Sequence, residues 1–140
     1  MKRAFAGILA CTLLTSGCDA FSDDPELNFT YEESTHGVIV PPSADAASLS
    51  RGEIVFVGQL NTPRPCYRLE ADIDVANGRA TLTVNARQTS TPNCETIVGR
   101  FLYQGSIRLL DAGNYQVLVR HEFDDAAWPS QEFTFSVLVR

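Results

Sequence analysis

Few residues in this chain are of types that could do chemistry: four cysteines, two histidines and scattered carboxylates. His121 lies close in sequence to Asp124 and Asp125, so one hypothesis is a general base whose imidazole is oriented by a carboxylate. The alternative, which we favour, is a half-buried histidine at a strand end. No G-x-S-x-G, P-loop or H-E-x-x-H pattern occurs. We therefore expect neither catalytic activity nor a cofactor.

Asp72 and Asp74 are two residues apart, so they share one face of the predicted strand and could indicate carboxylate chemistry or a calcium site. Calcium usually takes more oxygen ligands, many of them from loops, so we expect a solvated strand face instead. The histidines are distant from each other and show no HxxxH spacing, and the cysteines show no CxxC spacing. The sequence therefore predicts no metal site.

The N-terminus has the three parts of an export signal. Two basic residues precede an apolar stretch over residues 4–14, which is too short to span a bilayer. Residues 14–18, Leu-Thr-Ser-Gly-Cys, resemble the lipobox cut by bacterial signal peptidase II. The family usually has leucine three residues before the cysteine, where threonine stands here. The resemblance implies a bacterial lipoprotein with residues 1–17 as signal peptide and palmitate or related acyl chains on Cys18.

Two or three acyl chains, as mature bacterial lipoproteins carry, are enough for stable membrane anchoring. Asp19 resembles the signal that retains lipoproteins of enteric bacteria in the inner membrane. That resemblance implies the periplasmic side of the inner membrane, with the outer membrane as the alternative. An ordinary secretory signal cut after Ala20 is the alternative to lipidation.

The segment after Cys18 is acidic. Asp19 to Ser50 contains seven acids and no lysine or arginine, so we expect residues 18–50 to form an acidic spacer, about 30 Å long as a flexible coil. Alternation at Leu27, Phe29 and Tyr31 leaves an edge hairpin over 27–40 as the alternative. The remainder, 51–140, is close to neutral, and the absence of a basic patch argues against nucleic acid.

A β-hairpin centred on Asn77-Gly78 is the clearest structural prediction, because both central positions of such a turn need positive φ. The turn pairs residues whose numbers sum to 155. That register places apolar residues opposite one another on one face, from Leu69 with Ala86 to Val75 with Ala80, and polar residues on the other. A slip by one residue would destroy this match.

From residue 53 onward the hydrophobic period is two, so we predict an all-β domain over 51–140, with about six to seven strands in a single antiparallel sandwich. The segment from Leu110 to Tyr115, leading into an alternating strand, resembles the tyrosine corner of immunoglobulin-like and fibronectin-type-III-like sandwiches. The resemblance implies an immunoglobulin-like sandwich. The Cys–Trp–Cys spacing of true immunoglobulin domains is absent, since Trp128 follows both cysteines of the domain.

Cys66 and Cys94 remain after the signal is removed and Cys18 is lipidated. An even pair in an exported domain predicts a disulfide, here between the loops at the pole away from the Asn77-Gly78 turn. Closing a loop of about 29 residues contributes about 3.5 kcal/mol in the chain-entropy treatment.

The loop from Asp124 to Ser130 carries the only tryptophan, and Asp124, Asp125, Trp128 and Pro129 are the candidate partner-binding residues. The alternative is that Trp128 covers the open end of the core.

We expect a membrane-anchored envelope lipoprotein that binds or braces an envelope protein. The alternative function is an inhibitor, or a small-ligand or glycan-binding module that presents the Trp128 loop.

Overall fold

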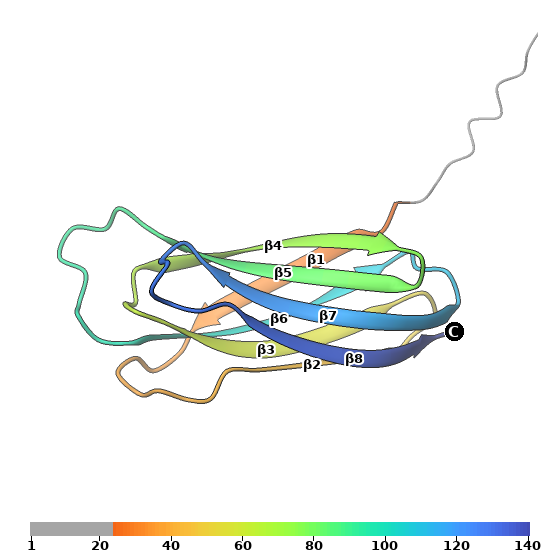
Figure 1. Cartoon of the computed structure of the whole chain (residues 1–140), viewed down its shortest axis with the longest axis horizontal. Coiled ribbons are helices and arrows are strands. Elements are labelled where there is room, and N and C mark those ends of the chain that lie inside the picture. Colours follow the sequence, from red (N-terminus) through yellow and green to blue (C-terminus); the bar gives the residue numbers. More distant parts are fainter. Residues whose placement is uncertain (1–23) are drawn as a thin grey trace, which may run out of the picture.

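Eight strands form two sheets that pack face to face in the computed structural model, which describes residues 24–140 (Figure 1). The expected signal peptide over 1–17 and the lipidation of Cys18 lie outside these residues. The strands are β1 (Glu26–Glu33), β2 (Ser43–Ala47), β3 (Ile54–Thr62), β4 (Tyr67–Ala76), β5 (Arg79–Gln88), β6 (Gly99–Arg108), β7 (Gly113–Phe123) and β8 (Gln131–Val139).

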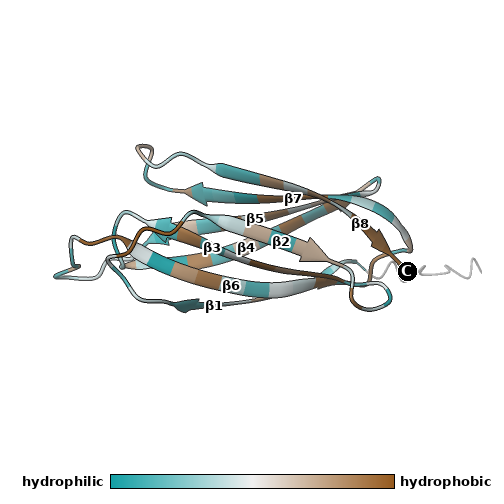
Figure 2. Cartoon of the chain, turned by 90° about the horizontal axis from the view of Figure 1, so that it is seen from below, coloured by the Kyte–Doolittle hydropathy of each residue, from teal (hydrophilic) through white to brown (hydrophobic). Residues whose placement is uncertain are grey.

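Sheet A has the strand order β1-β6-β3-β2, and sheet B has the order β4-β5-β7-β8. The predicted all-β sandwich is thus confirmed: six of its strands, β3 to β8, lie within 51–140, and β1 and β2 precede them. Every pair within sheet A is antiparallel. Hydrophilic and hydrophobic segments alternate along β6 and β7 (Figure 2), as a strand with one buried and one solvated face requires.

The two ends of the sandwich differ (Figure 1). At one end, the near pole, Pro25 lies beside the Asn77-Gly78 turn and the 109–112 loop. The opposite end, the far pole, holds the loops over 34–42, 63–66, 89–98 and 124–130. Backbone hydrogen bonds join these loops, among them Gly37 N to Val98 O at 2.9 Å and Thr89 N to Cys66 O at 2.9 Å.

The core lies between the sheets and consists of the inward-facing residues, which alternate with outward-facing ones along the strands. Both sheets contribute large side chains, and the burial of each removes apolar surface from water. The largest wholly buried apolar side chains are Phe101, Ile54, Leu60, Leu82, Ile107, Val84, Val117, Val119 and Val139.

The predicted hairpin is confirmed in every pair. Leu69 lies opposite Ala86 and Val75 opposite Ala80, while Asn77 and Gly78 have φ of 51° and 72°. The turn sets the register, and the same register places the apolar side chains inward.

One pair departs from the antiparallel expectation: β5 and β7 run parallel. The reason is the route of the chain. It leaves β5 at the far pole, returns through β6 in the opposite sheet, and re-enters sheet B at the near pole. Since β6 is not between them, β5 and β7 become neighbours with the same direction.

The sandwich begins at Glu26 and not at residue 51, so the expected spacer over 18–50 is wrong from residue 26 onward. β1 pairs with β6 and β2 pairs with β3, at opposite edges of sheet A. The alternative of an edge hairpin over 27–40 is also wrong, because residues 37–40 form no strand and β1 and β2 do not pair. β1 itself is an edge strand, as the alternation at Leu27, Phe29 and Tyr31 indicated.

The disulfide between Cys66 and Cys94 is confirmed, with an S–S distance of 2.05 Å. It links the loop before β4 to the loop after β5 at the far pole, as predicted.

The two residues of the expected tyrosine corner, Leu110 and Tyr115, are buried in the core. Within residues 24–140, however, no hydrogen bond from the Tyr115 hydroxyl to upstream backbone is found, so the tyrosine corner stays a prediction.

Gly58 gives a test of packing on the inner face of sheet A. A methyl group at this inward position of β3 would overlap the Tyr103 hydroxyl, whereas one at Gly113 would meet no atom within 4 Å. We predict that Gly58→Ala lowers the free energy of unfolding by about 1–3 kcal/mol, because overpacking displaces a buried ring. Gly113→Ala is the control and should change it by less than about 0.5 kcal/mol. Equal urea midpoints for the two variants would contradict this packing.

Candidate functional site

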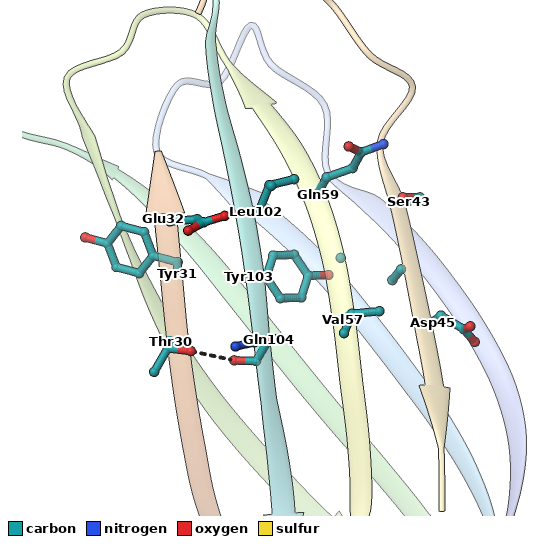
Figure 3. A pocket seen from close by; sticks show the side chains of 12 residues that line it. Thr30, Tyr31, Glu32, Ser43, Asp45, Val57, Gln59, Leu102, Tyr103 and Gln104 are labelled. Carbon is teal, nitrogen blue, oxygen red and sulfur yellow. Dashed lines mark hydrogen bonds between the residues drawn. The ribbon is translucent and has the colours of Figure 1, made fainter. Parts of the chain in front are cut away.

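A hollow of about 850 Å³ lies on the outer face of sheet A (Figure 3). All four strands of the sheet contribute to it, and sequence reasoning missed it. The outward side chains that line it are Thr30, Glu32, Ser43, Asp45, Val57, Gln59, Leu102 and Gln104.

Strand register arranges these side chains in two rows across the sheet. One row runs Thr30, Gln104, Val57, Asp45, and the next runs Glu32, Leu102, Gln59, Ser43. Each row therefore has a hydrogen-bonding or charged group at each end and an aliphatic side chain near its centre. Neighbouring strands lie about 4.8 Å apart, so a row is about 14 Å long.

The charged side chains that line the hollow are both negative, although the Arg100 guanidinium contacts the lining residue Gln59 at 3.0 Å. The lining includes Glu32 and Asp45 and no lysine, arginine or histidine. Within residues 24–140 neither carboxylate forms a salt bridge, although Asp45 Oδ1 accepts a hydrogen bond from Ala46 N at 2.8 Å. The hollow therefore favours neutral or cationic groups.

The segment 34–42 crosses from β1 to β2 and bounds the hollow at the far pole. Buried Asn61 holds it, because its side-chain amide bonds both the N–H and the carbonyl of Val40. Gln59 Nε2 donates to Pro41 O at 3.1 Å, and Gln59 Oε1 accepts from Arg100 at 3.0 Å. The Gln59 amide is thus occupied within the chain.

Behind the hollow, on the inner face, a hydrogen-bonded chain joins the two sheets. The Tyr103 hydroxyl of β6 lies 2.7 Å from His121 Nε2 of β7, and His121 Nδ1 lies 3.1 Å from Gln131 Oε1 of β8. An amide oxygen only accepts, so Nδ1 carries the proton and Nε2 accepts from Tyr103. With a neutral imidazole, each ring nitrogen of His121 has a hydrogen-bond partner of the opposite kind.

Burial sets the ionisation of this network. His121 is wholly buried, and removal from water lowers the pKa of its imidazole, with the Gln131 hydrogen bond acting in the opposite direction. Burial likewise raises the pKa of the Tyr103 phenol. Both groups are therefore neutral at pH 7. His121 is more deeply buried than the half-buried position expected from sequence.

The structure does not bring His121 together with Asp124 or Asp125. The Asp124 carboxylate accepts from Gln88 N at 2.9 Å, and Asp125 Oδ1 accepts from Ala127 N at 2.9 Å. Both aspartates thus fix the 124–130 loop, and the general-base hypothesis has no geometric support.

The candidate residues of the 124–130 loop lie at the far pole. The Trp128 ring is half-buried, with its centroid 6.3 Å from that of Phe123 in an edge-on arrangement. Pro129 is exposed. Trp128 therefore partly covers the end of the core and partly faces solvent, between the two alternatives considered for it.

The remaining chemistry-bearing residues lie apart from one another. Asp72 and Asp74 are exposed on the outer face of β4, and Asp72 accepts a hydrogen bond from Asn85 at 3.3 Å, as a solvated strand face implies. Among residues 24–140 no group of three or more metal-ligating side chains is found. The same residues contain no helix able to cross a membrane.

No family model, curated protein or solved structure matches this chain. The hollow and the buried network therefore have to be interpreted from their own geometry.

Acid should destabilise the fold through His121. Because its folded pKa is lowered, its contribution is present above the unfolded pKa of about 6.5 and is lost as pH falls below that value. We predict that the free energy of unfolding declines between pH 7 and 5.5, with a slope of at most about 1.4 kcal/mol per pH unit. His121→Gln should flatten this slope, because it removes the buried imidazole. Urea titrations at each pH measure it, and a slope that persists in His121→Gln contradicts the assignment.

Proposed function

We propose that this chain is a lipid-anchored module outside the bacterial cytoplasm that binds or braces another envelope protein and has no catalytic role. The N-terminal signal, ending in a cysteine that resembles a lipidation site, is the basis of the anchoring. The disulfide is consistent with it, because such bonds persist in oxidising compartments. Asp19 favours the periplasmic side of the inner membrane.

The position of the N-terminal end of β1, at one pole of the sandwich, supports the proposal most directly. Only seven residues, 19–25, lie between Cys18 and β1, and Pro25 is at the near pole. Strands of about ten residues separate the two poles by about 33 Å. An anchor at Cys18 thus leaves the far-pole loops and the outer face of sheet A accessible to a partner.

The partner surface that we favour is the hollow. It combines two carboxylates that form no salt bridge within residues 24–140 with the aliphatic side chains of Val57, which is 53% exposed, and half-buried Leu102. Apolar surface inside a polar rim is the arrangement by which many proteins bind their partners.

Lipidation is tested in a bacterium that has signal peptidase II. We predict that the chain incorporates labelled palmitate and partitions with membranes, and that Cys18→Ala loses both. Cys11→Ala is the control, since Cys11 lies within the apolar stretch of the signal and should leave labelling unchanged. An unlabelled chain, or a Cys18→Ala variant that still fractionates with membranes, would overturn the anchoring.

A second candidate is an inhibitor or a small-ligand or glycan-binding module that uses the 124–130 loop. The partial exposure of Trp128 at the far pole favours it. In cells, crosslinking followed by mass spectrometry separates the two candidates. We predict that Trp128→Ala keeps the crosslinked partner while Val57→Lys loses it. The reverse result, with unchanged urea midpoints, would favour the tryptophan loop.

A further inference from the structure

We propose that the hollow on sheet A binds an extended polypeptide segment in which two basic side chains flank an aliphatic one. This inference rests on the proposed binding function and names the chemistry of the partner. Its elements are the two rim carboxylates, the aliphatic floor and the polar groups that remain free between them.

The positions of the carboxylates set the spacing of the basic side chains. Glu32 is on β1 and Asp45 on β2, at opposite edges of the sheet and one row apart. Three strand spacings separate them by about 14 Å across the sheet. An extended segment rises about 3.3 Å per residue, so its residues i and i+4 lie about 13 Å apart and point to the same side. Flexible lysine side chains cover the offset of one row.

The centre of the hollow fits an aliphatic side chain at position i+2. Val57 and Leu102 are diagonal neighbours on the floor, and Val57 is 53% exposed. Such a contact removes apolar surface from water on both partners.

The floor favours a peptide over a glycan. Tyr31 and Tyr103 border the hollow, but their parity places their side chains on the inner face, and Figure 3 shows the Tyr103 ring directed toward β3. Tyr31 is 40% exposed on the edge strand β1, but neither tyrosine has the outward parity of the floor residues on which a sugar would stack.

Polar groups for a peptide backbone are present beside this floor. The side chains of Gln104 and Ser43 have no intramolecular hydrogen bond in the described part of the chain, in contrast to the occupied amide of Gln59. An amide supplies both donors and an acceptor, and a hydroxyl supplies one of each, so both polar groups of a peptide unit find partners.

The test is an NMR titration of the ¹⁵N-labelled full chain with a blocked pentapeptide of sequence lysine-serine-leucine-serine-lysine. We expect amide shifts to concentrate on β1, β6, β3 and β2 and to weaken with added salt. A pentapeptide with glutamate in place of both lysines should give none. Glu32→Gln and Asp45→Asn should each weaken binding about two- to fivefold, as the loss of an exposed ion pair does. Asp72→Asn, which removes an exposed carboxylate on sheet B, should leave it unchanged.

A second pair of variants tests the aliphatic centre. Val57→Lys should abolish binding, whereas Leu138→Lys on β8 is matched in exposure, at 54% against 53%, and should have no effect. Shifts that map outside sheet A, or equal losses in the matched variants, would overturn the proposal. So would a chitin oligosaccharide that shifts the hollow residues when the peptide does not. Any of these results would leave the palmitate experiment, and hence the anchoring, unaffected.

Discussion

Burial of one face of each sheet is the constraint on which the rest of this structure depends. Because side chains alternate along a strand, burying Phe56 and Leu60 of β3 forces Val57 and Gln59 to the outside. The same alternation in three neighbouring strands aligns their outward residues in rows. The rows of outward residues that line the hollow are therefore a consequence of core formation, because burial of one face fixes which residues point outward.

Local rules were sufficient where turn chemistry and burial pattern agree. The Asn77-Gly78 hairpin and its register follow from positive φ at the turn and from the apolar face, and both lie within about twenty consecutive residues. The disulfide between Cys66 and Cys94 followed similarly, since its position at the far pole depends only on that register.

Non-local pairing could not be predicted from the sequence. β2 is five residues of serine, alanine and aspartate, a composition typical of a linker, and it becomes a strand because β3 offers an edge. The parallel neighbours β5 and β7 likewise depend on β6 joining the other sheet. Half of the residues that line the hollow are on β1 and β2. The hollow was not predicted, because these residues were expected to form a spacer. The contact between Tyr103 and His121 also crosses sheets and has no sequence signal.

The pairing of β1 has a mechanical consequence. Tension applied between the N-terminal end of β1 and the far pole of the sandwich would pull β1 along its own axis. The eight residue pairs that join β1 to β6 would then bear the load together in shear, instead of opening one after another as in peeling. A sandwich loaded in this way would withstand stretching forces at β1, although that strand has a neighbour on one side only.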